Sequence, residues 1–273
     1  MIGCFRGSRL VRDAGCILSA GLSTYLFVGR PQMPLWINGL SATLTLALGF
    51  VLFRLAANVI ASNTNTKILE ILHVQMDPQR FLNQYEKIPA KLKRGSVNHA
   101  VTTIYLADGY AAKGDYDTAE RLVDAEPVDN ADEKLHAAIA AIRMNARVDY
   151  ALLRGDSAEG ERLLSEFRQV LKQGEAVNPS LAANMQDRVI LYAQWLQVMG
   201  GAPTGENFLQ DMLGRTPVLL QRLEILWVMA RSFLLRDESA AAREQFETIA
   251  SQGGKTHFTA DAKAALAKLS KLA

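Results

Sequence analysis

A run of 20 residues without a charge, Pro34 to Phe53, restricts this chain more than any other feature. As a helix rising 1.5 Å per residue, such a run extends about 30 Å, which is the hydrocarbon thickness of a bilayer. Arg30 and Arg54 bracket the run, and Trp36 lies near one end, where an amphipathic ring suits the membrane interface. The alternative is a buried helix of a large soluble core. We predict a transmembrane helix over residues 34–53.

A second uncharged segment, residues 14–29, precedes this run and would extend about 24 Å as a helix. Three arginines precede the segment, as in a signal peptide, but it ends in Phe27-Val28-Gly29 and lacks the small residues of a cleavage site. Pro31 and Pro34 separate the two segments, because proline interrupts a helix. We therefore predict a transmembrane helical hairpin with spans at 14–29 and 34–53, within a membrane anchor of residues 14–60.

Small residues recur at every fourth position of the second predicted span, at Gly39, Thr43 and Ala47. Such a stripe permits a neighbouring helix to approach closely, although ordinary membrane-helix composition explains it equally well. Lysines and arginines lie mainly before the first span and after the second, which places both termini in the cytoplasm. We predict an integral protein of the bacterial cell membrane, with a basic cytoplasmic N-terminus at residues 1–13.

The charges divide the chain into a basic front and an acidic body. Residues 1–94 hold 11 Lys and Arg against 4 Asp and Glu, and the remaining 19 basic and 24 acidic residues follow. We predict a basic juxtamembrane linker over residues 61–94, with a helical break at 62–66 and a short helix that opens at Asp77-Pro78. Its basic residues suit either anionic lipid headgroups or plain solvation.

From Ser96 onward, apolar residues recur every three or four positions, and Gly-Asp turns punctuate them. The clearest unit is LADGYAAKGDYDTAE, residues 106–120. Gly114 can adopt the left-handed conformation that ends one helix, and Asp115 can cap the next. This unit resembles a tetratricopeptide repeat, in which small residues, a tyrosine and a Gly-Asp-Tyr turn occupy fixed places; here they are Ala107, Tyr110, Gly114, Asp115, Tyr116 and Ala119.

Weaker copies of the turn follow at 154–161 and 200–206, and a fourth has Asp237 where glycine is usual. Their spacing exceeds the family's repeat of about 34 residues, so longer helices or loops must be inserted. Residues 258–272 read as a terminal capping helix. We predict an all-α chain, similar to bacterial membrane-anchored tetratricopeptide repeat proteins, in which a solenoid of antiparallel helix pairs occupies residues 95–273.

The resemblance implies a peptide-binding groove on the concave face of the repeats. Most of the charged positions in this groove are acidic, which predicts a protein or peptide ligand that is basic and partly apolar. Each of these residues could instead belong to an ordinary solvated helix face. The positions transferred from the family are Asp108, Asn145, Asp149, Asp187, Gln194, Gln197, Glu224, Trp227 and Arg231.

No catalytic motif stands out in the sequence. Gly253-Gly254-Lys255-Thr256 resembles the end of a phosphate loop, but Ile249 stands where that loop needs glycine. The four histidines lack partners at ligand spacing, and the two cysteines exclude a disulfide framework. We expect no enzyme activity, cofactor, metal, nucleotide or nucleic acid. The predicted function is a membrane-anchored adaptor or scaffold; the alternative is a structural accessory subunit of a membrane complex.

Overall fold

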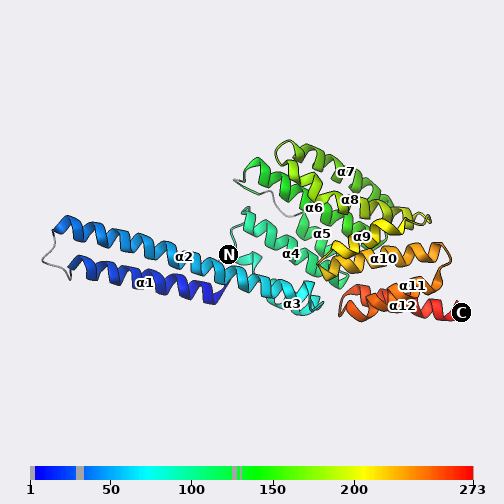
Figure 1. The fold of residues 1–273 in the computed structure, drawn as a ribbon, viewed down its shortest axis with the longest axis horizontal. Coiled ribbons are helices and arrows are strands. Elements are labelled where there is room, and N and C mark those ends of the chain that lie inside the picture. The colour runs from blue at the N-terminus through cyan, green and yellow to red at the C-terminus, as the bar shows by residue number, and fades with distance from the viewer. Residues whose placement is uncertain (1–3, 29–33, 125–127, 130, 273) are drawn as a thin grey trace. The chain divides into compact units, whose positions relative to one another are not determined.

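The computed structural model describes residues 4–28, 34–124, 128–129 and 131–272, and within these residues the chain contains helices and no strand. The prediction of an all-α protein is therefore confirmed. The chain divides into two compact units, Met1–Ile68 and Leu69–Ala273, which are described separately (Figure 1).

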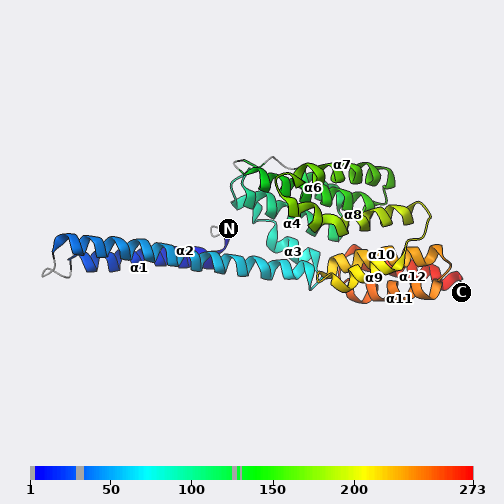
Figure 2. The same ribbon diagram turned by 45° about the horizontal axis from the view of Figure 1, so that its top comes forward.

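The first unit consists of α1 (Arg6–Val28) and most of α2 (Leu35–His73). The two helices lie side by side (Figures 1 and 2). The Ser23 hydroxyl donates to the Ala42 carbonyl at 2.8 Å, and a Cβ added at Gly15 would lie 2.0 Å from the Phe53 ring. From Gly15 to Ser23 the residue number rises along α1, while that of the contacting residue falls from Phe53 to Ala42 along α2. The two helices are therefore antiparallel.

Of the stripe of small residues, Gly39 lies near α1, where a Cβ would be 3.9 Å from the Phe27 ring, but Thr43 and Ala47 do not form the contact between α1 and α2. Thr43 and Ala47 are exposed, whereas Ala42, Ala57 and Ala61 are buried. Of the two explanations for the stripe, ordinary membrane-helix composition therefore accounts for Thr43 and Ala47.

The helix α2 continues without interruption through residues 62–66, where a break was predicted. Thr64 donates its hydroxyl to the Ile60 carbonyl at 2.7 Å, so this polar side chain is satisfied within the helix itself. Polar composition alone therefore did not end the helix. The sequence contains no proline or glycine at this point that would have forced an end.

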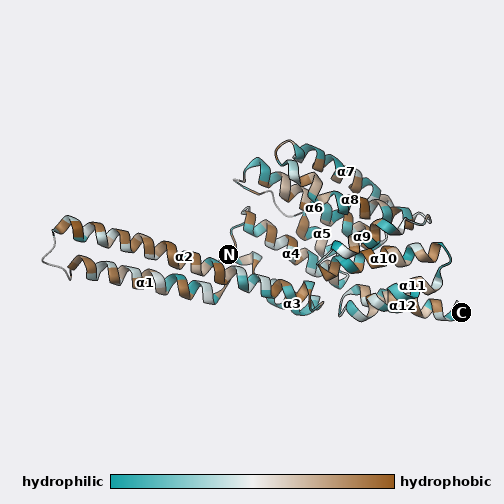
Figure 3. Ribbon diagram, viewed as in Figure 1, coloured by the Kyte–Doolittle hydropathy of each residue, from teal (hydrophilic) through white to brown (hydrophobic). Residues whose placement is uncertain are grey.

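Apolar side chains are exposed almost entirely on the first unit. Among the residues that the structure describes, 21 large hydrophobic residues are exposed; 18 of them lie between Leu10 and Val59, and the others are Val74, Val177 and Leu235. Figure 3 shows the apolar colouring along α1 and α2. Among the described helices, α2 alone is long and apolar enough to cross a membrane, by length and composition.

The second unit contains the remaining helices, of which α3 and η2 lie in the predicted linker. The remaining helices are α3 (Pro78–Tyr85), η2 (Pro89–Lys91), α4 (Val97–Lys113), α5 (Tyr116–Val123), α6 (Glu133–Arg154), α7 (Ser157–Glu175), α8 (Pro179–Met199), α9 (Glu206–Arg215), α10 (Leu219–Leu235), α11 (Ser239–Gln252) and α12 (His257–Leu272).

The short helix predicted after Asp77 is present as α3, and Asp77 caps it by accepting from the Arg80 amide. This helix packs on α4 and buries Phe81 and Tyr85 completely. The compact unit consequently begins at Leu69 and includes most of the segment 61–94, because the linker's aromatic side chains belong to a core.

The predicted helix-ending turns have the expected geometry. Gly114 and Gly155 end α4 and α6 with φ values of 92° and 84°, and Asp115 and Asp156 accept amide hydrogen bonds at the starts of α5 and α7. Asp237 follows α10 with φ of 61°, the left-handed conformation that glycine usually supplies. The fourth copy of the turn thus keeps the backbone conformation without the glycine.

The helices α4, α6, α8 and α10 form an inner row in which each packs on the next. On the other side, α5 packs on α4 and α6, α7 on α6 and α8, and α11 on α10 and α12. The last helix, α12, also packs against α4, and the Tyr116 ring lies edge-on to His257, with ring centroids 5.7 Å apart. The last described helix, α12, therefore meets α4, the first helix of the inner row.

The turn between α11 and α12 contacts the turn before α3. The Lys255 amide donates to the Met76 carbonyl at 2.8 Å, and the Lys255 ammonium lies 2.6 Å from the Asp77 carboxylate. A Cβ added at Gly254, whose φ is 55°, would lie 2.6 Å from the Met76 carbonyl oxygen. The GGKT sequence thus forms an inter-helix turn, and its glycine permits a close backbone approach.

Candidate functional site

Four of the nine predicted groove residues gather around a residue that the sequence analysis did not select, Arg188 on α8. Its guanidinium lies 2.6 Å from the Glu224 carboxylate and 3.2 Å from that of Asp149. It also donates to the Asn145 side chain at 3.4 Å. The exposed fraction of these charged side chains is only 12% for Arg188, 14% for Asp149 and 6% for Glu224. These charges are therefore sequestered in the interior.

Tyrosines complete this buried charge cluster. Arg188 donates to the Tyr192 hydroxyl at 2.6 Å and lies 4.8 Å from the centre of its ring. The Tyr150 hydroxyl donates to the Asp108 carboxylate at 3.0 Å, which joins α6 to α4. Every charged member has a partner, as burial of charge requires.

Burial disfavours the ionised form of the two aspartates in the cluster. It raises the pKa of Asp108 to about 6, although the hydrogen bond from Tyr150 opposes the shift. Burial, followed by the neighbouring Glu224, raises the pKa of Asp149 well above its usual value, and Arg188 opposes this. The arginine thus compensates its three acidic neighbours only in part.

A small cavity of about 100 Å³ adjoins the cluster and is lined by residues of α4, α6, α8, α10 and α12, together with His73. His257 also contributes to the lining, and its Nδ1 atom lies 3.0 Å from the Asp261 carboxylate. Within the described residues, no group of three or more His, Cys, Asp or Glu side chains could hold a metal ion.

Three other predicted groove residues lie outside the cluster. Asp187 forms an exposed ion pair with Arg215 at 2.9 Å. Gln197 donates to the Pro203 carbonyl at 2.8 Å and holds the loop after α8. Gln194 is half-buried on the same helix. None of these three lines a described hollow together with Trp227 and Arg231.

Trp227 and Arg231, the last two predicted residues, separate two adjoining open hollows. The first has a volume of about 380 Å³ and is lined by Leu153, Trp195, Met199 and other residues of α6, α7, α8 and α10. The second has a volume of about 460 Å³ and lies between α10 and α12. We call the two hollows together the Trp227 groove.

The lining of the Trp227 groove carries more positive than negative charge. Its cations are Arg154, Arg231 and Lys268, and its one acid is Asp261. Arg231 and Lys268 are exposed, and neither forms an ion pair with any residue that the structure describes. The lining of the Trp227 groove is therefore mainly positive, whereas the buried charge cluster around Arg188 is mainly acidic.

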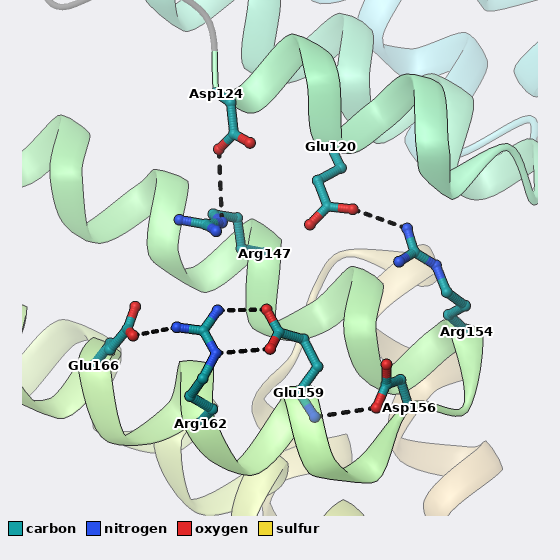
Figure 4. Close-up of polar contacts among 8 residues, drawn as sticks. All are labelled: Glu120, Asp124, Arg147, Arg154, Asp156, Glu159, Arg162 and Glu166. Atoms are coloured by element: carbon teal, nitrogen blue, oxygen red, sulfur yellow. Dashed lines mark hydrogen bonds and ion pairs between the residues drawn. The ribbon is translucent and has the colours of Figure 1, made fainter.

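Arg154 is held from outside the groove by the neighbouring helix α5. Figure 4 shows its ion pair with Glu120, at 2.9 Å, and a second pair between the same two segments, Arg147 with Asp124. The pairs of Arg162 with Glu159 and Glu166, also drawn there, lie within α7. The contact with Glu120 holds Arg154 on the rim of the first hollow.

Arg188 and Lys268 were not among the residues predicted from the sequence. Arg188 precedes Tyr192 by one helical turn, so the two lie on one face of α8, a signal that was available in the sequence. Lys268 was assigned to a terminal cap, and only the packing of α12 beside α10 brings it to Trp227.

Comparison with known proteins identifies no relative: no family model, no curated protein and no solved structure matches the chain.

Proposed function

We propose that this protein is a membrane-anchored adaptor whose tetratricopeptide-like helical array binds a segment of another protein in the Trp227 groove. The observation that carries the proposal is the confinement of exposed apolar side chains to the first unit, 18 of 21, beside a second unit with an ordinary polar surface and an open groove. An exposed apolar belt of this extent is compatible with lipid and not with water.

The repeating turns support the tetratricopeptide-like part of the proposal. Left-handed residues follow α4, α6 and α10, at Gly114, Gly155 and Asp237, and a further one, Gly201, follows α8. Each is succeeded by a helix that doubles back on the inner row or on its neighbour. A family defined by helix pairs with such turns uses its inner helices for binding peptides.

In this proposal α1 and α2 both cross the membrane as a hairpin, and the array lies in the cytoplasm. The apolar part of α1 carries exposed Ile17, Leu18 and Leu22, and its small Gly15 lies against Phe53 of α2. Arginines at 6, 9 and 12 and at 54 flank the pair on the side proposed as cytoplasmic.

Replacing Leu48 by arginine tests the anchor. The Leu48 side chain is 61% exposed, so in water the change would be nearly neutral. In a bilayer, we expect it to cost about 3 kcal/mol of insertion free energy and to reduce the fraction that resists carbonate extraction. Leu235→Arg, an exposed leucine of the second unit, is the matched control and is expected to change nothing. If carbonate extracts the same fraction of both variants, the proposal that α2 is a membrane anchor is contradicted.

A photo-reactive amino acid in place of Met199 tests binding in the groove. Met199 lines the first hollow, whereas Arg168 is exposed on α7 and lines no described hollow. In intact membranes, we expect a discrete crosslinked partner from position 199 and none from position 168, and its loss when Trp227→Ala is added. Equal crosslinking at both positions would contradict the proposal that the partner binds in the Trp227 groove.

A structural subunit of a membrane complex is the second candidate. It is favoured by two hollows on the α1–α2 pair, of about 380 and 310 Å³, that share Thr43 and Leu46. Small side chains on such a surface permit another transmembrane helix to pack closely. Size analysis after mild detergent extraction distinguishes the candidates, since an obligate subunit migrates with stoichiometric partners.

A further inference from the structure

We infer that the segment bound in the Trp227 groove is acidic and partly apolar. This inference rests on the proposed function, because it specifies the chemistry of the ligand at the same surface. The ligand charge inferred here is opposite to the one predicted from the sequence. That prediction rested on the number of acidic side chains along the inner helices, and the sequence does not show which of them a ligand can reach.

None of the acids behind that expectation lines the Trp227 groove, and each already has a partner. Asp149 and Glu224 are buried against Arg188, and Asp108 accepts from Tyr150. Asp187 is engaged by Arg215. A basic ligand would therefore have to displace an internal arginine or break an existing ion pair, whereas charge complementarity with an open surface has no such requirement.

Most of the charges that line the Trp227 groove are cationic. Arg231 belongs to both hollows, and Lys268 lies across the second hollow from α10. Both are exposed and without an ion-pair partner among the described residues. The one acid in the lining, Asp261, is already in contact with His257. Carboxylates of a ligand would thus meet two uncompensated cations, and Arg154 marks the opposite rim.

The apolar part of the ligand is assigned to the wall that the cations flank. Trp227 is partly buried, stands between the hollows and is supported edge-on by Phe246, with ring centroids 5.5 Å apart. Trp195 and Met199 continue this wall in the first hollow, and Leu234 and Leu269 do so in the second. A supported aromatic ring between two hollows suits an aliphatic or aromatic anchor residue, while the rim charges select the flanking acids.

Selection from an unbiased peptide library tests the charge of the ligand. Phage-displayed random dodecapeptides are selected on the full chain in nanodiscs, after removal of phage that bind empty nanodiscs. The same selection is run on Trp227→Ala. We expect the peptides enriched on the unmodified chain to carry an excess of Asp and Glu over Lys and Arg beside an aromatic or aliphatic residue. Trp227→Ala should lose this enrichment.

Affinities of the best-enriched peptide, measured by fluorescence anisotropy, test the two cations. Arg231→Gln and Lys268→Gln are each expected to weaken binding about fivefold, and the double variant about twentyfold. Arg168→Gln and Lys263→Gln are the matched controls, since both residues are exposed and lie outside the groove lining, and they should leave the affinity unchanged. Because the replaced side chains are exposed, these variants keep the fold.

The outcomes separate the two proposals. Enriched peptides that are basic and disappear with Trp227→Ala would overturn the acidic ligand and leave the groove function intact. Acidic peptides whose affinity is insensitive to both Arg231→Gln and Lys268→Gln would also overturn the assigned charges. Selections that are the same on the unmodified chain and on Trp227→Ala would overturn the groove function itself, and the inference with it.

Discussion

Replacing Arg188 by methionine is expected to lower the free energy of unfolding of the second unit by about 3–5 kcal/mol, because the change leaves buried acids without their cation. Asp149 and Glu224 lie 3.2 and 2.6 Å from the guanidinium, with exposed side-chain fractions of 14% and 6%. Methionine fills much of the same volume, so the loss reports the charge and not a cavity.

Chemical denaturation of the full chain in detergent, followed by helical circular dichroism, measures this loss. Arg215→Met is the matched control: Arg215 pairs with Asp187 and Asp211, but its side chain is 53% exposed, and an exposed pair contributes less than about 1 kcal/mol. Equal losses in the two variants would mean that burial of the cluster does not make Arg188 essential.

Replacing Asp108 by asparagine is expected to stabilise the second unit at pH 7. The pKa of Asp108 is about 6 in the folded chain and 3.8 as the ordinary value, so the folded state binds more protons between these values. Stability from this group therefore falls as the pH rises from 4 to 7, by roughly 3 kcal/mol in all. Asparagine removes the ionisation and still accepts the hydrogen bond from Tyr150.

Unfolding measured at pH 4.5 and pH 7 tests the sign. The unmodified chain should lose stability over this interval, and Asp108→Asn should lose less. Asp149, Glu224, Arg188 and Tyr150 face the same site in both proteins, so the difference isolates Asp108. Asp117→Asn, whose side chain is 89% exposed, is the control. A steeper pH dependence in Asp108→Asn would contradict the assignment.

Local structure was predictable wherever a few neighbouring residues determine it. Gly114 and Asp115 end one helix and begin the next through contacts within four residues, and Asp77 caps α3 in the same way. The continuity of α2 through residues 62–66 was missed because Ser, Thr and Asn disfavour a helix only weakly, and intrahelical bonding satisfies Thr64.

The nine positions transferred from the repeat family do not lie on one surface. Trp227 and Arg231 line open hollows, whereas Asp108, Asp149 and Glu224 lie at a separate small cavity with partners from neighbouring helices. Their sequestration depends on contacts between helices some 40 residues apart, such as that between Tyr150 and Asp108 at a separation of 42. A helix-by-helix pattern gives the face on which a side chain lies, and not whether another helix covers it.

The contact between the Lys255 turn and Met76 has a consequence for how the second unit unfolds. In an open repeat array each repeat contacts only its neighbours, so terminal repeats can unravel while the others stay folded. Here an ion pair joins Lys255 to Asp77, 178 positions apart in sequence, a hydrogen bond joins Lys255 to Met76, and α12 also packs on α4. Neither end can fray without breaking contacts with the other, and closing so long a loop adds only a logarithmic entropy cost. The second unit is therefore expected to unfold cooperatively, and a defect in α12 should weaken α3 and α4 at its other end.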